Sequence, residues 1–163
     1  MTSDLSKIKK IRSKKKFTIS LAESCTGGMI SKYLTSINGS SLFFNGACIS
    51  YSNQMKTRLL MVPKNTIINY GAVSHQTALA MVKGLKKITD SEILLSVTGV
   101  AGPSGGTART PVGCVFFGIG SKINKKYTFQ TTKKIFHEKT RIAIQKKSTE
   151  YAIYLILQEL KKI

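Results

Sequence analysis

The chain has 163 residues, 42% of them hydrophobic, which is typical of one folded domain and too apolar for a disordered chain. Its longest apolar stretches fall short of the roughly 18 residues that span a bilayer, and no apolar segment follows the basic amino terminus as in a secretory signal. Three widely separated cysteines without a CxxC pair argue against a disulfide framework and a cysteine zinc site. We therefore expect a single cytoplasmic domain over residues 1–163.

The formal net charge of +19 has two interpretations. Only four of the 26 basic residues are arginines, which grip phosphate and guanine bidentately, and the lysines are spread along the whole chain apart from a run in residues 9–16. This pattern favours a lysine-rich, solvated surface with no nucleic-acid partner beyond non-specific charge attraction. The alternative is an electrostatic footprint for an anionic partner.

Apolar runs that end at glycine-rich loops predict strands, and apolar residues three and four apart predict helices. In chain order, we expect a basic helix or arm (1–16), a strand (17–22), a helix from 27 to the turn at 38–39, a strand (43–51), a helix (54–61), a helix capped by Ser74, a strand (93–97), two strands joined by a turn near 122–125 (112–119 and 127–131), and a long helix from about 138. This alternation predicts a three-layer α/β/α sandwich with a mixed, mostly parallel sheet. Two glycine-rich loops follow buried strands, so both are expected at the carboxyl edge of the sheet, where such folds bind ligands.

The loop after the first strand carries hydroxyls and glycines at Ser24, Thr26, Gly27 and Gly28. Backbone amides at the start of a helix, together with the helix dipole, attract anions. Ordinary capping of the helix explains the two hydroxyl residues equally well. Cys25 has no base nearby in the sequence, so we interpret it as a small buried side chain rather than a nucleophile.

A second candidate site consists of Ser41, Tyr51 and Lys56. A serine hydroxyl needs a base to become a nucleophile, and a desolvated lysine can serve because burial lowers its pKa. The chain has only two histidines, so few residues could provide the base of a Ser-His-Asp triad. On spacing alone we favour a non-catalytic interpretation, in which Lys56 is a solvated surface lysine and Tyr51 a residue at the edge of the sheet. The reason is that serine–lysine pairs have no fixed separation in sequence across different folds.

The second glycine-rich loop, residues 98–107, includes Gly102, Gly105 and Gly106. Closely spaced glycines expose backbone groups and suit a nest for an oxyanion or a phosphate. A plain connecting loop is the alternative. Glu23 is the only acidic residue in any motif, so metal catalysis and a paired-carboxylate mechanism are poorly supported.

Eight short motifs of this sequence resemble, in their order and spacing, those of the CinA C-terminal domain family, which includes nicotinamide mononucleotide deamidases. They are AESCTGG (22–28), GSS (39–41), YSN (51–53), GAVS (71–74), TG (98–99), AGP (101–103), GGT (105–107) and PVG (111–113), within a span of about residues 17–120. The resemblance implies hydrolysis of the carboxamide of nicotinamide mononucleotide to nicotinic acid mononucleotide and ammonia. It also implies a homo-oligomer that needs no metal or cofactor.

The resemblance assigns a nucleophile to Ser41, a general base to Lys56 and an assisting role to Tyr51, against the preference from spacing. Ser24 is the competing nucleophile. The substrate-binding residues that it implies come from the two loops and the last helix: Ser24, Cys25, Thr26, Gly27, Gly28, Gly102, Gly105, Gly106 and Arg141.

The chain departs from the family pattern at three positions. The family usually has aspartate at the place of Ser104, lysine at the place of Thr110 and arginine at the place of Gln145. These changes make a second hypothesis credible, namely a nucleotide-binding module with weakened turnover. A basic nucleic-acid-binding protein is the third hypothesis, and it requires lysines gathered on one face beside aromatic stacking platforms.

Overall fold

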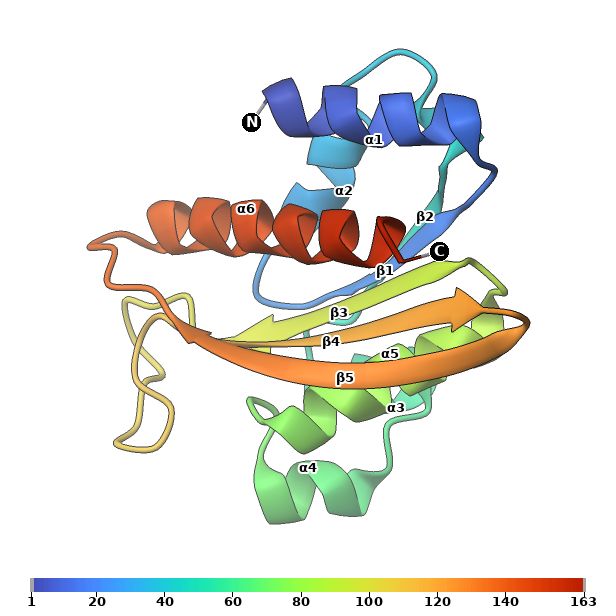
Figure 1. Cartoon of the computed structure of the whole chain (residues 1–163). Coiled ribbons are helices and arrows are strands. Elements are labelled where there is room, and N and C mark those ends of the chain that lie inside the picture. Colours follow the sequence, from blue (N-terminus) through green and yellow to red (C-terminus); the bar gives the residue numbers. More distant parts are fainter. Residues whose placement is uncertain (1, 163) are drawn as a thin grey trace.

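The computed structural model describes residues 2–162, so residues 1 and 163 of the expected domain lie outside the described part. Its elements are α1 (Thr2–Lys14), β1 (Ile19–Glu23), α2 (Met29–Leu34), the 3-10 helix η1 (Ser40–Leu42), β2 (Phe44–Ile49), α3 (Asn53–Leu60), α4 (Lys64–Tyr70), α5 (His75–Ile88), β3 (Ile93–Gly99), β4 (Cys114–Ile123), β5 (Lys126–Ile135) and α6 (Arg141–Leu160) (Figure 1). Within residues 2–162, no helix combines the length and the apolar character needed to cross a bilayer.

The five strands form one mixed sheet in the order β2-β1-β3-β4-β5. β1 pairs in parallel with β2 and β3, whereas β4 pairs antiparallel with both β3 and β5. Only β4 therefore runs against the other strands, which confirms the expected mixed, mostly parallel sheet. Asn124 and Lys125 join β4 to β5 with φ values of 50° and 65°, as primed two-residue hairpin turns require.

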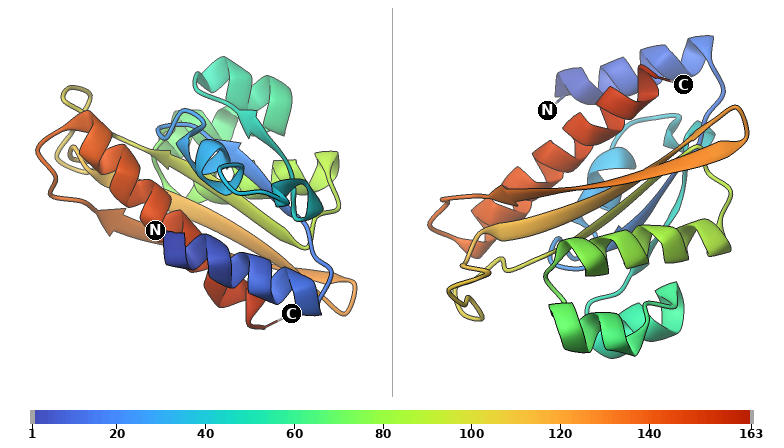
Figure 2. Two further views of the ribbon diagram at one scale, coloured as in Figure 1. Left: turned by 90° about the horizontal axis from the view of Figure 1, so that it is seen from above. Right: turned by 60° about the horizontal axis from the view of Figure 1, so that its bottom comes forward.

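Helices cover both faces of the sheet, which confirms the three-layer α/β/α sandwich. α6 and α5 lie on opposite faces, and both pack on β3 and β4 (Figures 1 and 2). α1 and α2 pack against α6, whereas α3 and α4 pack against α5. The first and last helices of the described chain are therefore neighbours, although they are far apart in the sequence.

The central strands are apolar because both of their faces are covered. All five residues of β1 are buried, as are six of the seven in β3, whereas exposed and partly buried residues alternate in the edge strand β2. Helix α5 packs closely against the end of α3 at Gly84, where a Cβ atom would lie 1.7 Å from the carbonyl oxygen of Leu60. This close approach fixes the end of α3 against α5.

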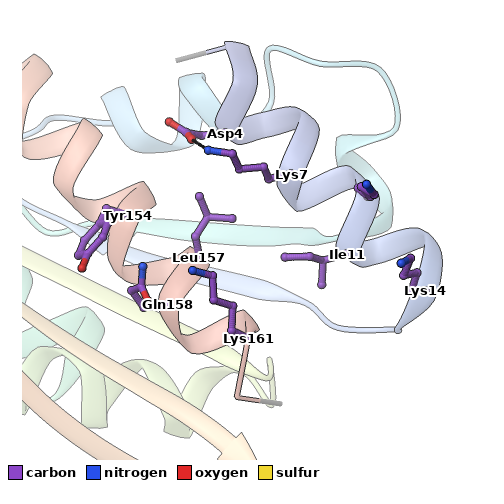
Figure 3. A pocket seen from close by; sticks show the side chains of 9 residues that line it. Asp4, Lys7, Ile11, Lys14, Tyr154, Leu157, Gln158 and Lys161 are labelled. Carbon is purple, nitrogen blue, oxygen red and sulfur yellow. Dashed lines mark hydrogen bonds and ion pairs between the residues drawn. The ribbon is translucent and has the colours of Figure 1, made fainter.

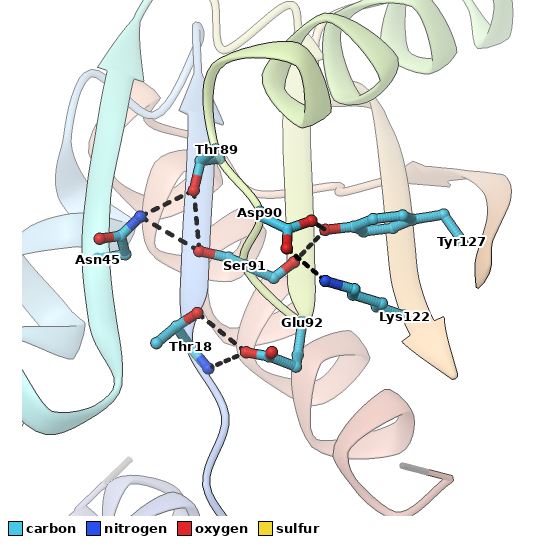
Figure 4. A network of polar contacts seen from close by, with 8 residues as sticks. All are labelled: Thr18, Asn45, Thr89, Asp90, Ser91, Glu92, Lys122 and Tyr127. Carbon is cyan, nitrogen blue, oxygen red and sulfur yellow. Dashed lines mark hydrogen bonds and ion pairs between the residues drawn. The ribbon is translucent and has the colours of Figure 1, made fainter. Parts of the chain in front are cut away.

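A network of polar side chains ties together the amino ends of the parallel strands (Figure 4). The backbone N–H and hydroxyl of Thr18 donate to the Glu92 carboxylate at 2.7 and 3.0 Å. Its other members are Asn45, Thr89, Asp90, Ser91, Lys122 and Tyr127. These contacts hold the amino ends of the parallel strands together, and the candidate site lies at the opposite, carboxyl ends of the same strands.

The structure departs from the expected elements at α2 and α4. Helix α4 follows Pro63 and was not expected, because it buries none of its own residues and so shows no apolar periodicity. Helix α2 is confined to Met29–Leu34, shorter than the expected helix, and begins after Gly28 with a left-handed φ of 95°. The basic segment near the amino terminus is a helix rather than an extended arm.

Candidate active site

Lys56 lies almost wholly inside the protein, with 2% of its surface exposed. It stands one turn into α3, a helix capped at its start by the Ser52 side chain. Its Nζ donates hydrogen bonds to Ser24 Oγ at 2.9 Å and to the carbonyl oxygens of Ser50 and Tyr51 at 3.0 and 3.1 Å. The turn from β2 into α3 therefore aims the amine at the residue that follows β1.

All three hydrogen-bond acceptors of the Lys56 amine are neutral oxygens. Burial lowers the pKa of Lys56 below its ordinary value of 10.5, because the charged form loses solvation. A neutral amine can still donate to the two carbonyls, while its lone pair accepts the hydroxyl proton of Ser24. The arrangement therefore suits transfer of a proton from the serine to the lysine.

Glu23 holds the loop that carries Ser24. Its carboxylate is fully buried and accepts hydrogen bonds from the Thr26 hydroxyl at 2.6 Å and from the backbone N–H groups of Gly28 and Ile30 at 3.0 and 3.2 Å. Ser31 donates to it through both N–H and hydroxyl, at 2.8 and 2.5 Å. The carboxylate thus caps the start of α2 from inside the fold.

The sequence does not reveal this role of Glu23, which stands out there only as the single acid in a motif. The available signal is an acidic residue directly before a loop that opens a helix. Thr26 and Gly28, both expected to bind substrate, donate to this buried carboxylate in the structure.

Arg141 joins three parts of the site. It is the first residue of α6, and its guanidinium donates to the Gly102 carbonyl and to the Tyr51 hydroxyl, both at 2.8 Å. A second link from α6 comes from Gln145, whose amide donates to the Cys25 carbonyl at 2.8 Å. The start of α6 thereby positions both glycine-rich loops and the end of β2.

The chain matches the CinA C-terminal domain family over residues 2–160. It belongs to this family. A CinA-like protein of Petrotoga mobilis is 47% identical over 145 residues, covering 89% of this chain and 35% of the relative. A putative competence-damage inducible protein of Halothermothrix orenii is 43% identical over 160 residues, covering 98% of this chain and 38% of the relative. The chain spans about a third of the length of these curated relatives.

Solved CinA structures share the fold. The crystal structure of competence/damage inducible protein CihA from Agrobacterium tumefaciens matches with a TM-score of 0.90 and 31% identity, covering 98% of this chain and 94% of that one. The competence damage-inducible protein A from Klebsiella pneumoniae matches with a TM-score of 0.88 and 24% identity, covering 98% and 96%. The sandwich described above is therefore the CinA fold.

In this CinA domain, the Ser24–Lys56 pair opens into a cavity of about 380 Å³. Most of the expected site residues line it: Ser24, Cys25, Tyr51, Lys56, Gly102, Gly105 and Arg141. Its wall also includes Asn53, Ala72 and Val73, which were not expected to bind substrate, and further residues of the second glycine-rich loop: Thr98, Gly99, Val100, Ala101 and Ser104. Thr26, Gly27, Gly28 and Gly106, which were expected to bind substrate, do not line it.

Ser41 lies at the other end of β2. It is exposed in η1, before the strand begins, whereas Lys56 is held by the carbonyl of Ser50 after the strand ends. The six residues of β2 rise by about 3.3 Å each and so separate Ser41 from Lys56 by roughly 20 Å. In this structure Ser24, rather than the expected Ser41, therefore lies beside Lys56.

Cys25 is buried as expected, with 5% of its surface exposed, and burial raises the pKa of its thiol to about 12. It therefore stays a neutral thiol at physiological pH. Of the three departures from the CinA pattern, Ser104 lines the cavity, whereas Thr110 is hydrogen-bonded to Thr107 at the end of the second loop. Gln145, at the place of the usual arginine, donates to the Cys25 carbonyl of the first loop.

Proposed function

We propose that this CinA domain is an amidohydrolase that converts nicotinamide mononucleotide to nicotinic acid mononucleotide and ammonia. The observation that carries this proposal is the 2.9 Å contact between Lys56 Nζ and Ser24 Oγ at the wall of an open cavity. It pairs a hydroxyl nucleophile with a buried amine of lowered pKa, the combination that serine–lysine hydrolysis requires. Membership in the CinA family supports a nucleotide-related role, and the chemistry is inferred from this pair.

In the proposed reaction, neutral Lys56 takes the hydroxyl proton of Ser24 as Oγ bonds to the carboxamide carbon. The tetrahedral intermediate then expels the amide nitrogen, which receives the proton from the Lys56 ammonium and leaves as ammonia. Water attacks the resulting ester with Lys56 again acting as base, and the serine hydroxyl is restored as the carboxylate product leaves. Lysine thus alternates between base and acid in each half of the reaction.

Arg141 is the proposed anchor for the substrate phosphate. A guanidinium carries five N–H donors, of which Gly102 and Tyr51 engage two, and its planar fork suits a phosphate. Gly102 and Gly105 lie in the same wall and let a ligand approach the backbone. Tyr51 would act through Arg141, which it holds by its hydroxyl.

A binding module without turnover is the second candidate. The observation that favours it is Gln145, a neutral side chain where the family pattern has an arginine, bound to the loop that carries the nucleophile. Loss of that positive charge would weaken the stabilisation of an oxyanion or a phosphate while leaving the cavity intact. The two candidates differ in one readout, because only the enzyme releases ammonia.

Ammonia release from nicotinamide mononucleotide should be measured for the parent and for Ser24→Ala, Lys56→Met and Ser41→Ala. We expect turnover in the parent and a fall of about a thousandfold or more in the first two variants, because nucleophile and base act as a unit. Ser41→Ala is the matched control and should keep the parental rate. Loss of turnover in Ser41→Ala alone would overturn the assignment of Ser24, and a folded parent that binds the nucleotide without releasing ammonia would identify the binding module.

A further inference from the structure

A groove runs between α1 and the carboxyl-terminal half of α6, apart from the candidate active site (Figure 3). Its volume is about 610 Å³, within the range of about 300–1,000 Å³ that is usual for ligand pockets. Its lining comes from the two helices and the residue that ends α6: Asp4, Lys7, Lys10, Ile11 and Lys14 from α1, Tyr154, Leu157 and Gln158 from α6, and Lys161 directly after α6. None of these residues lines the cavity at Lys56.

The floor of the groove is apolar. Ile11 and Leu157 face one another from the two helices, and Tyr154 stands farther along α6 (Figure 3). Leu157 is 8% exposed, whereas Tyr154 is 52% exposed and stacks on Tyr151 with a centroid separation of 5.7 Å. An aromatic ring held in place and half open to solvent adds a rigid apolar contact surface.

Both walls of the groove are cationic. Lys7, Lys10 and Lys14 follow one another three and four residues apart, so they form a row about 10 Å long on one side of α1. Lys161 stands on the α6 wall. Asp4 is the single acid of the lining and pairs with Lys7 at 2.9 Å, and among residues 4–162 no ion pair is described for the other three lysines of the groove.

We propose that this groove docks an acidic amphipathic helix of a partner protein. Such a helix would place its apolar stripe on the floor and carry acidic side chains on both flanks, where they meet Lys10 and Lys14 on one wall and Lys161 on the other. A fatty-acid-like ligand concentrates its charge at one end, and a nucleic acid strand places its phosphates on one edge. Cations on both sides of an apolar floor therefore favour the helix.

The partner is not a second copy of this chain. The whole sequence holds seven acidic residues against 26 basic ones, and Glu23 and Glu159 are both buried. On the exposed surface of α6, Glu150 already pairs with Lys147 at 2.9 Å. The residues of this sequence therefore do not supply a helix with free acids on both flanks.

The test uses a fluorescein-labelled 18-residue peptide with leucines three and four residues apart and glutamates on both flanks. A second peptide has the same composition in an order that destroys the apolar stripe. Binding is measured by fluorescence anisotropy for the parent and for two triple variants. One reverses the groove (Lys10→Glu, Lys14→Glu, Lys161→Glu), and the other reverses exposed lysines elsewhere (Lys64→Glu, Lys87→Glu, Lys125→Glu).

The two triple variants carry the same net charge, so only the position of the charges differs. We expect the striped peptide to bind the parent and the second triple variant alike, and the groove variant to lose about tenfold or more in affinity, a change of 1.4 kcal/mol. Equal losses in both variants, equal binding of the two peptides, or no binding to the parent would overturn the proposal. So would stronger, groove-dependent binding of a 20-nucleotide oligothymidine or of anionic vesicles than of the striped peptide.

Discussion

Lys56 Nζ lies 2.9 Å from Ser24 Oγ, although 32 residues separate the two in the sequence. Two independent elements bring them together. Ser24 directly follows β1, and Lys56 projects back from α3 toward the same edge of the sheet. Because β1 and β2 pair in parallel, the loop after each strand emerges at one edge, which makes this contact a consequence of strand order.

The lowered pKa of Lys56 predicts how activity depends on pH. The base must be neutral, and burial brings its pKa below 10.5, so the neutral fraction grows as the pH rises toward that lowered value. We expect kcat/KM to rise by about tenfold per pH unit on the acid side and then to level off. A pH–rate profile measures this dependence. In the residual activity of Lys56→Met, the rise of kcat/KM on the acid side should be absent. A rate independent of pH in the parent would contradict a lysine base.

Replacing the buried carboxylate of Glu23 should destabilise the domain. In Glu23→Gln the amide places N–H donors where N–H and hydroxyl groups already point at the side chain, so some buried donors lose their acceptor. We expect a loss of about 2–4 kcal/mol in the free energy of unfolding. Urea denaturation measures it, with Glu150→Gln as the surface control, for which a change below about 1 kcal/mol is expected. A loss no larger than that of the control would show that Glu23 is not the support of this loop.

Gly84→Ala tests the packing of α5 on α3. The new Cβ would meet the backbone of Leu60 at 1.7 Å, and backbone cannot move aside as a flexible side chain does. We expect a net destabilisation of about 1–3 kcal/mol from overpacking, although alanine favours a helix more than glycine does. Thermal unfolding is the measurement, and Lys83→Ala, an exposed change on the same helix, is the comparison. An unchanged midpoint in Gly84→Ala would mean that α3 shifts freely.

Arg141→Lys should separate substrate binding from chemistry. Lysine retains the positive charge but lacks the planar fork that reaches the Gly102 carbonyl and the Tyr51 hydroxyl together. For nicotinamide mononucleotide we expect KM to rise by about tenfold while kcat changes less, the pattern of a lost uniform binding interaction. Steady-state kinetics checks this, and Tyr51→Phe should shift KM in the same direction by a smaller factor. A loss confined to kcat would place Arg141 in the chemical step instead.

The strongest local patterns predicted most elements of the fold. β1 and β3 are short apolar runs, and α5 shows apolar residues three and four apart behind the cap at Ser74, so their local sequences agree with their places in the structure. Helix α4 could not be predicted in this way, because a helix that buries none of its residues leaves no apolar stripe. The expected helix is longer than α2 because the start of α2 depends on contacts with Glu23, which local spacing does not reveal.

In the candidate site, too, local sequence predicts some features, whereas others depend on contacts between distant parts of the chain. The sequence by itself predicted that the two glycine-rich loops lie together at the carboxyl ends of the strands. Tyr51 and Lys56 were assigned to the site only by the resemblance to the CinA family. The sequence did not determine which of the many lysines is buried and desolvated, because burial depends on the residues from distant parts of the chain that pack over a side chain. Only the tertiary structure decided that Ser24 rather than Ser41 contacts Lys56. The two serines lie at opposite ends of neighbouring parallel strands, and their separation in the sequence does not reveal this separation in space.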